Sequence, residues 1–152
     1  MKTLSLLFVL FPILFTCGCK SFRIGNTILT PYDVGRDITV VYLLSEDHLP
    51  KDKVIAVKAL YISFSEIMDE AEKYESTGEF PFDSILEKSL ESKIKDTTVL
   101  IFASKIANRY WENLNSRFNF TSSVIKDQIE ILKEFRRGIE DALEDYRPEP
   151  SD

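Results

Sequence analysis

Histidine, cysteine and glycine are scarce in this sequence. Its 152 residues include one histidine, His48, two cysteines and five glycines. Carboxylate-bridged metal sites in helical bundles need two Glu-x-x-His pairs, so a single histidine excludes that class of metal protein. Five glycines leave little material for a phosphate-binding loop. We expect His48 between two helices, in a solvated loop or at a helix C-terminus, and we predict no metal and no cofactor.

Basic residues are also in the minority. The chain carries 19 lysines and arginines against 25 aspartates and glutamates, which gives a formal net charge of −6. A nucleic-acid partner requires clustered lysine and arginine to neutralise its phosphates, so this acidic balance argues against one. The hydrophobic content, 44%, is that of a folded chain, and the length allows one domain.

Both cysteines lie near the N-terminus, at positions 17 and 19. The rest of the chain therefore holds no disulfide framework and no cysteine metal site. One basic residue, Lys2, precedes an apolar run over residues 4–15. Because a membrane-spanning helix needs about 20 apolar residues, this shorter run predicts a secretory signal peptide. An uncleaved anchor helix is the alternative.

The residues that follow the apolar run, Thr16-Cys17-Gly18-Cys19-Lys20, resemble the lipobox of bacterial lipoproteins. In that family a small residue precedes a cysteine that receives acyl chains, such as palmitate, and becomes the first mature residue. Gly18 before Cys19 fits the small position. The sequence departs from the family further upstream, since Thr16 stands where leucine is preferred and Cys17 where a small residue is preferred.

Cys17 is the alternative lipidation site. Leu14 fits the family pattern for Cys17, but Phe15 and Thr16 occupy the positions of small residues. We therefore predict lipidation at Cys19, with residues 1–18 as the signal peptide and residues 19–30 as the acylated cysteine and a flexible tether.

The resemblance implies a lipid bilayer as partner and the bacterial cell envelope as location. Two or more acyl chains are needed for stable anchoring, and a lipoprotein cysteine carries them. Lys20 stands where an aspartate would retain an enteric lipoprotein at the inner membrane, so the outer membrane is favoured in a Gram-negative host. An ordinary cleaved signal peptide would instead leave a soluble protein outside the cytoplasm.

Beyond the tether, apolar residues recur at intervals of three and four, which is the spacing of amphipathic helices. Thr30-Pro31 and Pro50 are typical helix starts, and Asp96 indicates a break. Two segments, 38–44 and 97–103, also have strand-like composition, which leaves strands open there. We expect helices over about residues 31–45, 50–74, 81–94, 97–118 and 123–147.

Each expected helix has one apolar face, so none is stable alone. The sequence therefore predicts an all-α fold, a small antiparallel bundle of four to five helices over residues 31–147. Residues 148–152 hold two prolines and are expected to be a frayed tail.

Few side chains in the expected helices point to chemistry. Glu66 and Glu70 share one helix and are the candidate acid–base pair of an enzyme, although a solvated helix face has the same spacing. Trp111 follows Tyr110, and neighbours on a helix differ by about 100° in direction, so both cannot face the core. Trp111 is therefore a candidate partner contact, with packing at the edge of the core as the alternative.

The last expected helix contains an interior glycine, Gly138, which costs about 1 kcal/mol relative to alanine. It indicates either a close helix crossing or a tolerated substitution. Arg136 and Arg137 precede Glu140 and Asp141 by four residues, which is the spacing of surface ion pairs.

The sequence-based expectation for function is a non-catalytic, membrane-anchored interaction or structural module that docks on an envelope protein. Short lipoproteins of this kind occur in bacteria and in bacteriophages, where some block entry of further phage or take part in lysis. The rival expectation is a soluble secreted or periplasmic helical protein. It would be either a carboxylate-based enzyme or a carrier with a ligand cavity between its helices.

Overall fold

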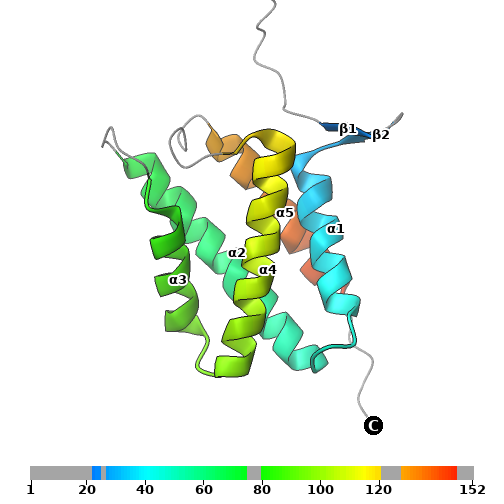
Figure 1. Cartoon of the computed structure of the whole chain (residues 1–152), viewed down its shortest axis with the longest axis vertical. Coiled ribbons are helices and arrows are strands. Elements are labelled where there is room, and N and C mark those ends of the chain that lie inside the picture. Colours follow the sequence, from blue (N-terminus) through cyan, green and yellow to red (C-terminus); the bar gives the residue numbers. More distant parts are fainter. Residues whose placement is uncertain (1–21, 25–26, 75–79, 121–127, 147–152) are drawn as a thin grey trace, which may run out of the picture.

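The computed structural model describes residues 22–24, 27–74, 80–120 and 128–146. Within these residues, five helices form a bundle and a two-stranded ribbon lies at one end of it (Figure 1). Along the chain the elements are β1 (Phe22–Ile24), β2 (Thr27–Leu29), α1 (Pro31–Leu44), α2 (Pro50–Lys73), α3 (Phe82–Lys93), α4 (Thr97–Phe118) and α5 (Ile129–Asp145).

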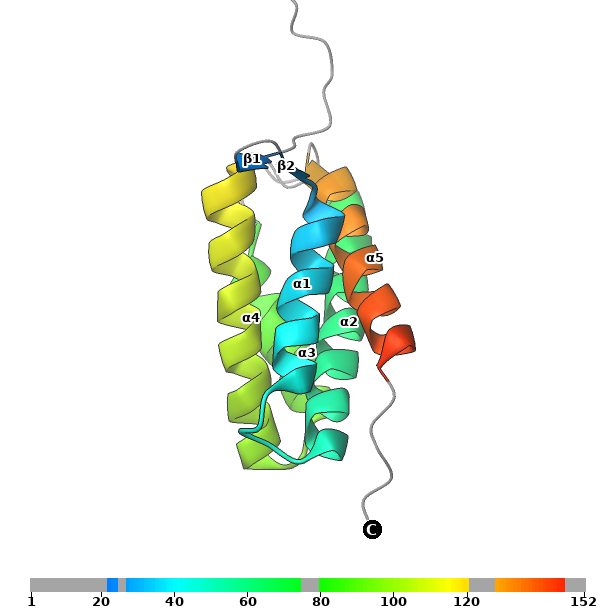
Figure 2. The ribbon, with the colours of Figure 1, turned by 90° about the vertical axis from the view of Figure 1, so that its right-hand side faces the viewer.

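Successive helices run in opposite directions along the bundle axis, which makes α1 and α5 parallel neighbours (Figure 2). The predicted all-α antiparallel bundle is therefore confirmed. Residues 38–44 and 97–103 are helical, in α1 and α4, so the strand alternative is wrong in both places. The first residues of the last expected helix and the expected tail lie outside the described residues.

Short polar side chains define where two of the helices begin. Thr30 caps α1: its side chain accepts a hydrogen bond from the backbone N–H of Asp33, whose carboxylate accepts one from the N–H of Thr30. The Asp96 carboxylate accepts from the N–H groups of Thr98 and Val99, 2.8 and 3.1 Å away, and so starts α4. These caps satisfy donors that a helix leaves unpaired at its first turn.

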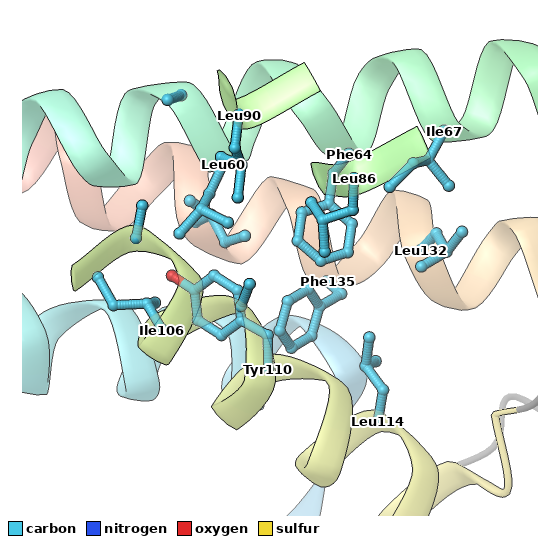
Figure 3. Packing of buried hydrophobic residues seen from close by; sticks show 14 of the residues in the cluster. Leu60, Phe64, Ile67, Leu86, Leu90, Ile106, Tyr110, Leu114, Leu132 and Phe135 are labelled. Carbon is cyan, nitrogen blue, oxygen red and sulfur yellow. The ribbon is translucent and has the colours of Figure 1, made fainter. Parts of the chain in front are cut away.

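Aromatic rings from three helices fill the centre of the bundle (Figure 3). The ring of Phe64 on α2 lies 6.0 Å from that of Tyr110 on α4 and 5.7 Å from that of Phe135 on α5, and the last two are 5.0 Å apart. Leucine and isoleucine side chains surround them, and the side chains that are almost fully buried include Leu60, Ile67, Leu90, Ile106, Leu114, Leu132 and Ile139.

One polar pair lies inside this apolar core. Thr39 donates its hydroxyl hydrogen to the carbonyl oxygen of Gly35, 2.7 Å away, so the Tyr110 hydroxyl must donate to Thr39 Oγ1 across 2.6 Å. Burial raises the pKa of Tyr110 above its ordinary value, which keeps the phenol neutral. The bond fixes α4 against α1 at one register without leaving a buried hydroxyl unpaired.

The helices α1 and α5 touch through their backbones. A Cβ atom added to Gly138 would come within 3.0 Å of the carbonyl oxygen of Tyr32 and the backbone nitrogen of Arg36, and one added to Gly35 would meet the carbonyl oxygen of Phe135. The close helix crossing indicated by Gly138 is therefore confirmed, and Gly35 is its counterpart on the other helix.

The segment expected to be a flexible tether contains the ribbon. β1 pairs with β2 antiparallel, with Phe22 opposite Leu29 and Ile24 opposite Thr27, and Thr30 follows directly as the cap of α1. The structure differs from the expected tether for a reason visible in the sequence: β-branched residues flank Gly25-Asn26, which is a two-residue hairpin signal. The described part of this segment is therefore a ribbon that leads directly into α1.

Candidate functional site

The predicted lipidation site, Cys19, and its alternative, Cys17, lie outside the described residues. Among the residues that the structure describes, no helix has both the length and the apolar character needed to cross a bilayer. The lipid anchor therefore stays a sequence-based prediction, and the described residues determine only how the bundle continues from it.

Trp111, the predicted partner contact, packs at the edge of the core. Its indole lies 4.4 Å from the ring of Phe82 on α3, tilted by 34°, and meets Phe120 edge-on at 5.4 Å. The side chain is half-buried, while the neighbouring Tyr110 is fully buried. This geometry matches the alternative of core-edge packing and leaves one side of the indole exposed.

We expect Trp111→Ala to lower the melting temperature by several degrees, because the substitution removes two ring contacts and opens space between α3 and α4. Thermal melts followed by circular dichroism would measure this. An unchanged melt together with weaker capture of envelope proteins would contradict the packing role and favour a partner contact.

The two candidate catalytic carboxylates lie in different surroundings. Glu66 accepts hydrogen bonds from Lys93 Nζ, at 2.7 Å, and from Ser89 Oγ. Ser89 Oγ also lies within hydrogen-bond distance of Ser63 Oγ, which is on the same helix as Glu66. Glu70 is exposed on α2. Because Ser89 and Lys93 lie on α3, this polar cluster links α2 to α3.

The polar cluster is poorly suited to acid–base chemistry. The hydrogen bonds from Lys93 and Ser89 hold the pKa of the Glu66 carboxyl below its usual range, so it carries its charge throughout the neutral range. A serine nucleophile at Ser89 would need a neutral lysine as its base, and Lys93 is instead paired with a carboxylate. The described residues contain no group of three or more histidine, cysteine, aspartate or glutamate side chains able to hold a metal.

His48 differs from its expected position in a solvated loop. It does lie between α1 and α2, but its imidazole is half-buried and packs 4.0 Å from the ring of Phe102 on α4. In the same connection, the buried Lys53 donates from Nζ to the carbonyl oxygen of Ser45, just past the end of α1. A cation at the C-terminus of a helix satisfies exposed carbonyls and the helix dipole, so Lys53 secures the end of α1, while His48 contributes a ring contact with α4.

The arginines of α5 do not form the expected ion pairs four residues apart. Arg136 donates to Ser65 on α2 across 2.6 Å, and Arg137 pairs with Glu134 on the preceding turn. The acidic partners are used by tyrosines: Glu140 accepts from Tyr61 and Asp141 accepts from Tyr32. This prediction is wrong because Ser65 on α2 binds Arg136, and Glu134, one turn earlier on α5, binds Arg137.

Among the residues whose burial the structure describes, the three most exposed large apolar side chains lie at the α1–α2 corner. It comprises Val41, Leu44 and Leu49, which are 66%, 68% and 60% exposed. The first two are three residues apart on α1 and share a face, and Leu49 caps the start of α2. Val41 and Leu44 on one face of α1, with Leu49 five residues further along the chain, are therefore a candidate surface for a partner.

A second surface feature is the α3–α4 groove, which is lined by residues of both helices. Its floor includes Leu90 and Leu100, and Ile101 at its edge is 54% exposed. Charged and polar side chains form its two sides, with Glu87 and Glu91 on α3 and Ser104, Lys105 and Asn108 on α4. The sequence-based reasoning missed this groove, because it forms only where two helices diverge.

No protein-family model, curated protein or solved structure significantly matches this chain.

Proposed function

We propose that this protein is a lipid-anchored protein of the bacterial cell envelope whose helical bundle is a non-catalytic interaction or structural module. Its partners are the bilayer, through acyl chains on Cys19, and an envelope protein that docks on the α1–α2 corner. The outer membrane is its location in a Gram-negative host. The gene could belong to a bacterium or to a phage. In a phage, the module would serve in blocking entry of further phage or in lysis.

The position of the ribbon supports a fixed orientation of the bundle on the membrane. Cys19 precedes the first residue of β1 by three positions, and an extended chain spans at most about 3.6 Å per residue. An acyl anchor on Cys19 would therefore hold the ribbon end of the bundle within about 11 Å of the bilayer. The opposite end then faces away from the membrane.

The observation that carries the proposal is the exposure of Val41, Leu44 and Leu49 at that opposite end. The helix α1 has 14 residues, so at 1.5 Å per residue it carries the corner about 20 Å beyond the ribbon. This distance puts apolar side chains within reach of a neighbouring envelope protein rather than of the lipid. An acidic chain gains little from anionic headgroups, which leaves the acyl chains as the main membrane attachment.

The rival functions find less support. A carboxylate-based enzyme needs an acid whose pKa is raised toward neutrality, and the ion pair with Lys93 lowers that of Glu66. A ligand carrier needs an unfilled apolar space between its helices. The centre of this bundle is instead filled by the mutually packed rings of Phe64, Tyr110 and Phe135.

The anchor is tested by Cys19→Ser in the full chain. We expect this variant to move from the membrane fraction to the soluble envelope fraction, because the acyl chains supply most of the membrane affinity. Fractionation followed by immunoblotting measures the change, and Cys17→Ser is the matched control, which should stay on membranes. Retention of Cys19→Ser with release of Cys17→Ser would assign the anchor to Cys17. Retention of both variants would contradict the lipoprotein proposal.

A further inference from the structure

The α3–α4 groove carries charges of opposite sign on its two sides. Glu87 and Glu91 are four residues apart on α3, so they lie on one face of that helix, and Lys105 lies across from them on α4. All three side chains are exposed, and no described residue forms an ion pair with any of them within 4.0 Å. Between the two sides, Leu100 and the exposed Ile101 add apolar surface.

We propose that the α3–α4 groove is a self-association surface, and that its occupant is a second copy of this chain related by a two-fold axis parallel to the bundle axis. Such an axis sets α4 of one copy opposite α3 of the other at the same height. Lys105 of each copy then faces Glu87 and Glu91 of its partner, so the opposite charges meet twice. The same operation carries the exposed Ile101 of each copy toward the groove of the other.

The charges exclude the other face-to-face arrangement. A two-fold axis perpendicular to the helices would set α3 against α3 and α4 against α4. Glu87 and Glu91 would then face their own copies, and Lys105 would face Lys105. Like charges opposed in this way disfavour an interface. The pattern of charge on the groove therefore selects the parallel axis without reference to the membrane.

The anchor selects the same axis by a separate argument, which rests on the proposed function. Two copies held in one leaflet have their ribbon ends on the same side, and only an axis parallel to the bundle axis keeps them there. Anchoring also confines both copies to the membrane surface, which raises their effective concentration and allows a modest interface to be populated. The groove lies along the side of the bundle, so pairing through it leaves the α1–α2 corner uncovered.

Site-directed cross-linking of the full chain tests the predicted axis. Two differently tagged copies are co-expressed, one with Glu91→Cys and the other with Lys105→Cys, and the cell envelopes are treated with a mild oxidant. The parallel axis predicts cross-links between positions 91 and 105, with few between two copies of position 91 or of position 105. Mass spectrometry of the linked peptides separates these products from any that form through Cys17 or Cys19.

Charge reversal tests the contacts themselves. Lys105→Glu should raise the dimer dissociation constant about tenfold or more, because two attractive pairs become repulsive. Adding Glu87→Lys and Glu91→Lys to the same chain should restore pairing, while Lys58→Glu, at an exposed position on α2, is the control that leaves pairing unchanged. Sedimentation of the purified full chain in detergent measures the constants.

The outcomes separate this inference from the proposed function. Dominant 91–91 and 105–105 cross-links, or a membrane-bound protein that forms no cross-link through the groove, would overturn the self-association surface. Failure of the triple charge reversal to restore pairing would overturn it as well. A protein that is found in the soluble envelope fraction and still forms the 91–105 cross-link would support the groove and contradict the lipid anchor.

Discussion

Gly138→Ala is expected to destabilise the bundle by about 3 kcal/mol, which corresponds to a fall in melting temperature of about 10 °C for a domain of this size. Helix propensity alone predicts the opposite sign, a gain of about 1 kcal/mol. The crossing decides between the two effects, because the new methyl group would overlap the backbone of Tyr32 and Arg36. Backbone atoms cannot turn aside as a side chain does, so α1 and α5 would have to separate.

Gly35→Ala should have a similar effect from the other side of the crossing, where Phe135 supplies the opposing backbone. Ser116→Ala, at an exposed position on α4, is the control for helix propensity and should leave the melt unchanged or raise it slightly. Thermal unfolding followed by circular dichroism measures all three variants. A higher melting temperature for Gly138→Ala would show that the two helices do not touch through their backbones.

The second large effect is expected at the centre of the core. Phe64 is 1% exposed and its ring meets those of Phe82, Tyr110 and Phe135. Phe64→Ala should cost about 3–5 kcal/mol, since it removes buried apolar surface and leaves a cavity among three helices. That is a large share of the roughly 5–15 kcal/mol by which domains are usually stable.

Urea unfolding of the same variants gives the free energies directly. Ile62→Ala is the matched control, because Ile62 lies two residues away on the same helix with 44% of its surface exposed, and it should cost less than about 1 kcal/mol. Phe64→Leu should fall between the two. Equal unfolding free energies for Phe64→Ala and Ile62→Ala would mean that α2 presents a different face to the core.

Helical spacing was enough to predict the five helices and the apolar face of α2; the start of the last expected helix lies outside the described residues. Val57, Phe64 and Met68 are buried as the three-and-four spacing predicts, and Thr30 and Asp96 begin helices as their capping chemistry predicts. These features depend on residues close in sequence. Tyr61 shows where this reasoning ends: it belongs to the same stripe, but its hydroxyl donates to Glu140 at the edge of α2 and α5.

Features that depend on two distant segments could not be predicted in the same way. From the sequence, Lys53 is expected to be a solvated residue in the first turn of a helix. Its partner, the carbonyl oxygen of Ser45, is identified only once the end of α1 is placed beside it. The link from Glu66 to Ser89 and Lys93 joins residues more than twenty positions apart. Gly35, like Gly138, is a glycine inside an expected helix. Neither glycine, taken from the sequence alone, indicates which other helix lies against it.

The pairing of the first helix with the last has a consequence for how the protein is made. Tyr32 bonds to Asp141 and Arg36 to Asp145, each across 109 positions of the chain. Contacts of such long sequence separation form late, because a large loop must close before they are made. During synthesis, α1 is made long before α5 and has no partner at its glycine crossing until then. If the protein is exported as proposed above, this late closure would leave the chain open while it passes through a secretion channel.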